Sequence, residues 1–130
     1  MFTVSKKIEI AGAHKLDLPY DSPCKRLHGH NWIIEVEISC STLNKQGMVV
    51  DFKCLKETME RVIKEPLDHR NISGIIPVNP TAENMAKWVA DGIQNYIIGD
   101  GPEGPDDDEI PVVSKVAVQE SEGNKACYIP

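Results

Sequence analysis

Alternating hydrophobic and polar residues dominate the first forty positions of this 130-residue chain. Between residues 31 and 42 the apolar side chains fall on even positions and the polar ones on odd positions, with Ile33 as the exception. The same even spacing, interrupted at position 6, runs from Phe2 to Ile10 and leads towards His14. Because neighbouring residues of a strand face opposite sides of a sheet, both segments are predicted to be half-buried antiparallel strands.

The hydrophobic period changes near residue 50, where apolar residues begin to recur every three or four positions. A first helix is predicted from Phe52 to Ile63 and is expected to end near Pro66, because proline disrupts a helix interior. A second helix is predicted to begin within residues 79–81, where either Asn79 or Thr81 can cap it. Its apolar face carries Met85, Trp88, Val89, Ile93, Tyr96 and Ile97.

Two closing strands are predicted over residues 110–121 and 125–129. The segment 99–109 is acidic and rich in glycine and proline, so it is predicted to be a solvated loop. The order strand, strand, helix, helix, strand, strand predicts an α+β fold, in which two helices cover one face of a four-stranded antiparallel sheet. The length predicts a single domain over residues 1–130.

Three of the four histidines fall within seventeen consecutive residues. His28 and His30 are two positions apart and share the parity of the buried face of their strand, so their imidazoles are expected to point inward together. With His14 they would form a three-nitrogen zinc site with an open fourth position, which is typical of catalytic zinc. His-x-His pairs also arise by chance, and the Cys24 thiolate could close such a site. The spacing leaves these alternatives open.

A carboxylate continues the buried parity of the third predicted strand. Every second residue from Ile110 to Val118 shares one face, and Glu120 is the next residue of that parity. Burying a carboxylate is costly unless it is paired. Glu120 therefore either marks the point where the strand enters water or binds a planar ligand that offers two adjacent N–H donors, such as an arginine or the edge of a pterin.

Two further groups have the composition of catalytic residues. Cys24 lies beside Lys25 and Arg26, and neighbouring positive charges lower the pKa of a thiol. Asp68 and His69 could act as a general base and the carboxylate that orients it, although adjacent residues need not face each other.

Composition limits the partners and the cellular compartment. The net charge of −6 and a pI near 5.1 argue against nucleic acid or an anionic membrane as the main partner. No apolar stretch approaches the roughly 18 residues needed to cross a bilayer, and the N-terminus lacks the apolar core of a signal peptide. The four cysteines show no paired framework, so reduced thiols and a cytoplasmic location are expected.

Taken together, these motifs resemble the family of 6-pyruvoyl-tetrahydropterin synthases and 6-carboxytetrahydropterin synthases. The matching segments, which occur in family order, are His14, 24–31 (CKRLHGHN), 47–52 (GMVVDF), 67–69 (LDH), 79–84 (NPTAEN) and 116–121 (VAVQES). The resemblance implies the tunnelling fold, in which subunits join their sheets around a trimeric barrel and two trimers stack into a homohexamer.

The resemblance also implies roles for nine residues. It makes His14, His28 and His30 the ligands of a zinc cofactor, Cys24, Asp68 and His69 the catalytic groups, and Glu120, Thr81 and Glu83 the pterin-binding residues. Asp68 and His69 would act across a subunit interface. A helix cap explains Thr81 equally well.

The three residues between Cys24 and His28 resemble the compact spacing of the 6-carboxytetrahydropterin synthases of queuosine biosynthesis. The resemblance then implies a lyase that converts 7,8-dihydroneopterin triphosphate to 6-carboxy-5,6,7,8-tetrahydropterin, acetaldehyde and triphosphate. Lys25 and Arg26 are candidates for binding the triphosphate. The alternatives are a 6-pyruvoyl-tetrahydropterin synthase and a non-catalytic, zinc-stabilised pterin-binding or assembly module.

Overall fold

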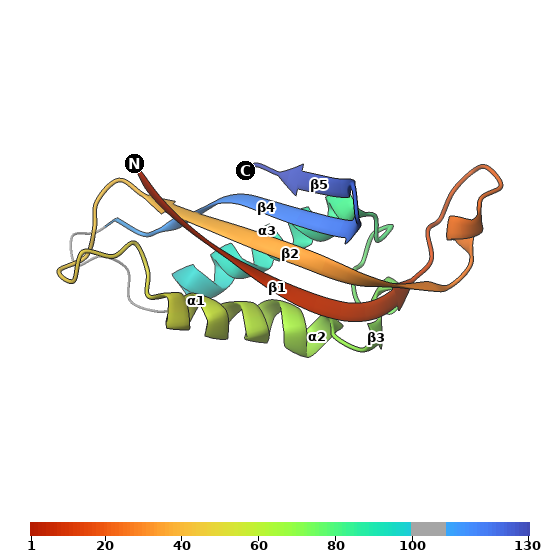
Figure 1. The fold of residues 1–130 in the computed structure, drawn as a ribbon, viewed down its shortest axis with the longest axis horizontal. Coiled ribbons are helices and arrows are strands. Elements are labelled where there is room, and N and C mark those ends of the chain that lie inside the picture. Colours follow the sequence, from red (N-terminus) through yellow and green to blue (C-terminus); the bar gives the residue numbers. More distant parts are fainter. Residues whose placement is uncertain (100–108) are drawn as a thin grey trace.

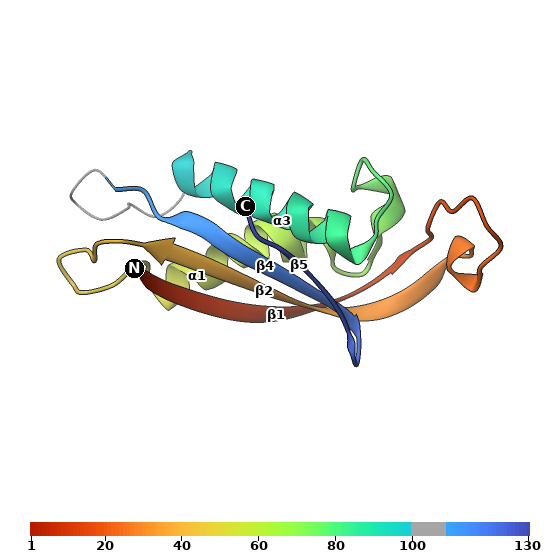
Figure 2. The same ribbon diagram turned by 90° about the horizontal axis from the view of Figure 1, so that it is seen from above.

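A twisted sheet forms one layer of the protein, and helices form the other (Figures 1 and 2). This computed structural model describes residues 1–99 and 109–130, so the predicted acidic loop lies outside the described residues except at its two ends. The sheet order is β3-β1-β2-β4-β5. The strands are β1 (Phe2–His14), β2 (His28–Cys40), β3 (Arg70–Asn71), β4 (Val112–Ser121) and β5 (Asn124–Tyr128).

The two predicted helices are present and lie on the same face of the sheet (Figure 2). The first comprises α1 (Phe52–Met59), a π-helical turn (Glu60–Lys64) and α2 (Glu65–Leu67), and the second is α3 (Ala82–Ile98). The first helix was expected to end near Pro66 and ends one residue later, at Leu67. The turn before Pro66 widens because proline has no N–H and its ring crowds the carbonyl four residues earlier. None of the helices in the described ranges is long and apolar enough to span a membrane.

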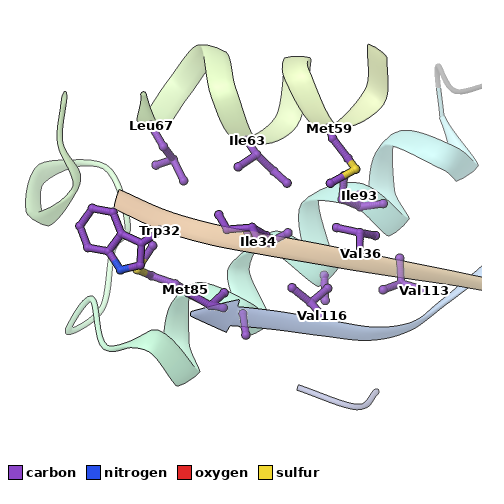
Figure 3. Packing of buried hydrophobic residues seen from close by; sticks show 14 of the residues in the cluster. Trp32, Ile34, Val36, Met59, Ile63, Leu67, Met85, Ile93, Val113 and Val116 are labelled. Carbon is purple, nitrogen blue, oxygen red and sulfur yellow. The ribbon is translucent and has the colours of Figure 1, made fainter. Parts of the chain in front are cut away.

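The core lies between the sheet and the helices (Figure 3). Trp32, Ile34 and Val36 of β2 are fully buried, as their alternation predicts. They belong to one cluster of buried residues that also includes Met59, Ile63 and Leu67 of the first helix and Met85 and Ile93 of α3. Phe52, which was expected on the buried helix face, is 56% exposed at the first position of α1.

The sheet differs from the predicted four-stranded antiparallel sheet by one short strand. In β3, Arg70 and Asn71 pair in parallel with Gly12 and Ala13 of β1. Two residues are too few to show an alternating pattern, so this strand could not be predicted from the sequence. The sheet is therefore mixed, and β3 forms the edge beside the end of β1 that carries His14.

The parity predicted for β4 is wrong at its beginning and right at its end. Glu37 of β2 pairs with Lys115, but the next residue, Ile38, pairs with Val113, which leaves Ser114 as the extra residue of a β-bulge. Val113 is buried and Val112 is 48% exposed, the reverse of the expectation. Beyond the bulge, residues 116 and 118 are buried as predicted.

Gly12 allows β3 to approach β1 closely. A Cβ at this position would lie 3.1 Å from the Arg70 carbonyl oxygen, 3.2 Å from the Trp32 ring and 3.3 Å from Ile72. We expect Gly12→Ala to lower the free energy of unfolding by about 1–3 kcal/mol, the usual cost of overpacking, in urea denaturation. Gly74→Ala is the matched control, because no atom lies within 4 Å of a Cβ there. Equal stability of the two variants would contradict this account.

Glu109 holds the beginning of the final segment against the end of β2. Its carboxylate accepts hydrogen bonds from the backbone N–H and hydroxyl groups of Ser41 and Thr42. These bonds, with the Ser41 hydroxyl contributing most, lower the pKa of Glu109 from 4.5 to about 2.

A depressed carboxyl pKa gives this link a defined pH dependence. The hydrogen bonds of the Glu109 carboxylate stabilise the folded state fully above the unfolded-state pKa of 4.5, and this stabilisation is lost as the pH falls through the folded-state pKa of about 2. An NMR titration of the Glu109 carboxyl carbon is expected to show a midpoint near 2, and Ser41→Ala should raise it. A midpoint near 4.5 in both proteins would exclude the link.

Candidate functional site

Strand register brings the three predicted histidines together at one end of the sheet. Antiparallel pairing places His14, the last residue of β1, directly opposite His28, the first residue of β2. His30 follows two residues later, and Glu120 arrives from the end of β4. One ligand atom from each of these four side chains lies within 4.8 Å of all the others. We call these four residues the His/Glu cluster.

Backbone carbonyl groups fix the tautomers of two of the imidazoles. The Nδ1 atom of His14 is 2.8 Å from the carbonyl oxygen of Pro80, and that of His28 is 2.7 Å from the carbonyl oxygen of Arg26. A carbonyl oxygen only accepts hydrogen bonds, so both Nδ1 atoms carry the proton and both Nε2 atoms present a lone pair. This outer-shell arrangement is typical of histidines that bind metals.

The distances between the ligand atoms fit a divalent metal. The Nε2 atoms of His14 and His28 are 3.1 Å apart, close to the roughly 3.3 Å that separates two ligands of tetrahedral zinc. Two lone pairs that face each other at this distance repel each other unless a proton or a metal cation lies between them. Three imidazoles and one carboxylate are also the donor types that zinc prefers.

His30 supports the same interpretation. Its Nε2 atom is buried and makes no hydrogen bond to any described residue. It lies 2.7 Å from Oε1 of Glu120, but this contact lacks the angles of a hydrogen bond. A buried nitrogen without a hydrogen bond is costly, and a cation bound between it and the Glu120 carboxylate would satisfy both groups.

Burial favours the neutral form of the His14 imidazole. His14 is fully buried and packs edge-on against the Trp32 ring, with 4.9 Å between the ring centroids. Desolvation, the largest cause, lowers the pKa of His14, although the hydrogen bond to the Pro80 carbonyl opposes it. A neutral imidazole can bind a metal without first losing a proton.

Asp68 and His69 do face each other. Oδ2 of Asp68 is 2.9 Å from Nδ1 of His69, so the carboxylate holds the ring with Nε2 free. The backbone of β1 fixes both residues, because Ala11 donates its N–H to Oδ1 of Asp68 and accepts the N–H of His69. The hydrogen bond from the Ala11 N–H is the largest cause of the lowered pKa of Asp68, and His69 adds to it, whereas desolvation acts in the opposite direction. The lowered pKa favours the carboxylate form of Asp68.

The conformation of His69 displays its ring to solvent. Its φ of 57° lies in the left-handed region, which is uncommon for histidine, and its side chain is 81% exposed. Within the described ranges, the His/Glu cluster includes neither Asp68 nor His69. One chain therefore does not bring its own acid–base pair and its own histidines into a single group.

Cys24 occupies a short 3₁₀ turn (Pro23–Lys25) in the connection between β1 and β2. Its N–H donates to the Ser22 hydroxyl, and its carbonyl oxygen accepts the N–H of Leu16, so the turn is tied to the end of β1. The residue is partly buried, and in the described chain no cysteine belongs to the cluster. The side chain that lies beside the three imidazoles is thus the carboxylate of Glu120 rather than the thiol of Cys24.

The other cysteines are unpaired in the structure. Cys40 is buried, as its strand parity predicts. Cys54 is partly buried, whereas Cys127, which was expected to be structural, is exposed on the edge strand β5.

Thr81 and Glu83 lie at the start of α3. The Thr81 hydroxyl accepts the N–H of Asn84 and therefore caps the helix, as one of the two predicted alternatives. Glu83 is exposed in the first turn, where the helix dipole favours a negative charge. Asn79, the other predicted cap, instead bonds both the N–H and the carbonyl oxygen of Asp17.

Sequence reasoning missed the contact between Glu120 and the histidines and the two carbonyl groups that orient the rings. Parity left Glu120 open between a strand end in water and a ligand anchor, and the structure places it beside His30 with its side chain 24% exposed. Its position beside His30 depends on the pairing of β2 with β4, in which Ile33 lies opposite Gln119. A single sequence contains no signal for that register.

The chain is similar to several known proteins. The family model described as 6-pyruvoyl tetrahydropterin synthase matches residues 3–130. A dihydroneopterin monophosphate aldolase from Pyrococcus furiosus is 42% identical over 76 residues, which cover 58% of this chain and 63% of that protein. A 6-carboxy-5,6,7,8-tetrahydropterin synthase from Haemophilus influenzae is 42% identical over 72 residues, covering 53% and 50%. The matches therefore span half to two thirds of these relatives.

Two longer matches complete the comparison. The human 6-pyruvoyl tetrahydrobiopterin synthase is 30% identical over 140 residues, covering 96% of this chain and 89% of the human protein. The solved structure of a 6-pyruvoyl tetrahydropterin synthase from Caenorhabditis elegans superposes with a TM-score of 0.77 at 24% identity. It covers 99% of this chain and 95% of the worm chain, which confirms the predicted fold.

Proposed function

Because this chain belongs to the 6-pyruvoyl tetrahydropterin synthase family, we propose that it is a zinc-dependent 6-carboxy-5,6,7,8-tetrahydropterin synthase. The substrate is 7,8-dihydroneopterin triphosphate, which reacts with one water molecule to give the 6-carboxy product, acetaldehyde and triphosphate. The enzyme is then a lyase of queuosine biosynthesis that acts in the cytoplasm. The relative from Haemophilus influenzae carries this name.

The observation that carries the proposal is the convergence of the Nε2 atoms of His14, His28 and His30 on one point, with Cys24 just before His28 in the chain. A zinc ion held by these nitrogens would act as a Lewis acid on the hydroxylated side chain of the substrate. Cys24 removes or relays a proton on one face of that side chain. The carboxylate of Glu120 anchors the pterin by accepting hydrogen bonds from the two adjacent N–H donors of the pterin. Thr81 and Glu83 help to line the pocket.

A second acid–base unit completes the mechanism. Asp68 orients His69 so that Nε2 of His69 accepts a proton from the other side-chain hydroxyl. We place this unit across an interface between copies of the chain, because the His69 side chain is 81% exposed and lies beside the edge strand β3. The active enzyme is thus a homo-oligomer, a trimer or a dimer of trimers.

An open hollow of about 430 Å³ beside the cluster suits the phosphate groups. Lys15, Lys25 and Ser73 line it together with Pro80, whose carbonyl oxygen holds His14. Two lysines and a hydroxyl are suitable partners for a polyphosphate. Arg26 is the other predicted phosphate ligand, and its carbonyl oxygen accepts a hydrogen bond from Nδ1 of His28.

Product analysis tests the proposal. The zinc-loaded protein is incubated with 7,8-dihydroneopterin triphosphate, the pterin is identified by mass spectrometry and acetaldehyde is measured separately. Formation of the 6-carboxy pterin with an equal amount of acetaldehyde is expected. A pyruvoyl pterin without acetaldehyde would instead assign the activity named for the human relative, which matches nearly the whole chain.

Metal removal separates catalysis from a purely structural role. Chelation is expected to abolish turnover while circular dichroism shows a folded protein, because the large hydrophobic core contains none of the four cluster residues. Unfolding on chelation would favour a zinc-stabilised, non-catalytic module.

A further inference from the structure

Glu120 occupies a position that a simple pterin anchor would not need. Its Oε1 atom lies 2.7 Å from Nε2 of His30 and 3.6 Å from Nε2 of His14. These separations bracket the roughly 3.3 Å expected between two ligands of tetrahedral zinc. The carboxylate oxygen therefore stands where a fourth ligand would stand.

The backbone directs this side chain to the histidines. In the β4–β5 pair, Gln119 lies opposite Lys125 and Ser121 lies opposite Asn124, which leaves Glu120 as the extra residue of a β-bulge. Bulges re-aim a side chain and often occur beside active sites. The side chain remains 24% exposed, so a ligand from solvent can still reach it.

We propose that Glu120 is the fourth metal ligand of the substrate-free protein and leaves the metal when a pterin binds. The proposal rests on the proposed function, which supplies the pterin. The two adjacent N–H donors of the pterin edge engage both carboxylate oxygens, so the pterin competes with the metal for Oε1. Pterin recognition then frees a coordination position beside three imidazoles at the moment when the substrate side chain arrives.

The test uses the full chain stripped of metal and reloaded with Co²⁺ as a spectroscopic probe, with Zn²⁺ affinity measured by competition. Glu120→Gln preserves the shape of the residue but weakens it as a ligand. We expect a changed Co²⁺ absorption spectrum and a Zn²⁺ affinity lower by at least about 10-fold, the smallest loss typical for an outer-shell partner of a ligand. Glu122→Gln, an exposed glutamate in the adjacent turn, is the matched control and should behave like the wild type.

A second variant separates ligation from charge. Glu120→Asp retains the carboxylate but shortens its reach by one methylene group, so its Co²⁺ spectrum should resemble that of Glu120→Gln. Neopterin is then titrated into each Co²⁺ protein. Bound neopterin should give the wild type and the glutamine variant the same spectrum, because its hydroxylated side chain then occupies the position that Glu120 has left in one protein and never held in the other.

The outcomes distinguish this inference from the proposed function. If both Glu120 variants had the Co²⁺ spectrum and the Zn²⁺ affinity of the wild type, Glu120 would not be a ligand, even if the wild type produces the carboxy pterin. A changed spectrum in the variants with no response of the wild type to bound neopterin would overturn the release step. If the wild type bound neither metal, both the inference and the proposed function would fail.

Discussion

Replacing His28 by alanine is expected to lower the Zn²⁺ affinity by at least about 100-fold and to reduce turnover to background. Loss of an outer-shell partner alone costs roughly 10–100-fold, and His28 is proposed to bind the metal directly. His28 is the best choice among the three histidines, because His14 is fully buried and its replacement would disturb the core. Isothermal titration calorimetry with Zn²⁺ and a turnover assay provide the two measurements.

The matched control is His69→Ala. This histidine is 81% exposed and lies outside the His/Glu cluster in the described chain. It should retain the Zn²⁺ affinity of the wild type and lose activity, because its proposed role is proton transfer. Equal Zn²⁺ affinities for the two variants would show that His28 does not bind the metal.

The second large effect is expected at the thiol. Cys24→Ala should reduce turnover by roughly 10²–10⁴-fold, the usual contribution of a positioned acid or base. The variant should still bind about one zinc per subunit, because three imidazoles and a carboxylate already supply the four ligands of a tetrahedral site. Turnover at saturating substrate and metal analysis of the purified protein measure the two quantities.

Cys127→Ala is the control for this variant, because Cys127 is an exposed cysteine on the edge strand β5. It should match the wild type in both measurements. Loss of zinc from Cys24→Ala would instead identify Cys24 as a ligand, contrary to the geometry of the cluster.

Together with the Glu120 proposal, these variants assign one function to each part of the site. In the proposed mechanism the histidines hold the metal, the thiol and the Asp68–His69 pair move protons, and Glu120 links substrate recognition to the metal. The chain offers a control of the same residue type for each group, at His69, Cys127 and Glu122.

Local patterns were sufficient for the elements of the fold. The alternation in β1 and β2 and the three-to-four spacing of α1 and α3 follow directly from the geometry of a strand and a helix. The errors arise where a distant segment decides the outcome. Ser114 bulges because of its pairing with β2, and the two-residue strand β3 forms only because β1 lies beside it.

The candidate site divides in the same way. Residue types and spacing were enough to identify His14, His28 and His30, because two of them share a strand face and zinc prefers imidazole. They were not enough to show that Glu120 lies beside these histidines, since that depends on a bulge and on strand register.

The sequence by itself determined the four longer strands, the long helices and the identity of the chemically competent residues, because these depend on side-chain type and on separations of a few positions. The tertiary structure decided which of those residues meet. The Nε2 lone pairs of His14 and His28 are aimed by carbonyl groups of Pro80 and Arg26, and the carbonyl of Pro80 is 66 residues away from His14 in the chain. Only the packed fold can fix such distances, because a contact between remote segments leaves no periodic trace in the sequence.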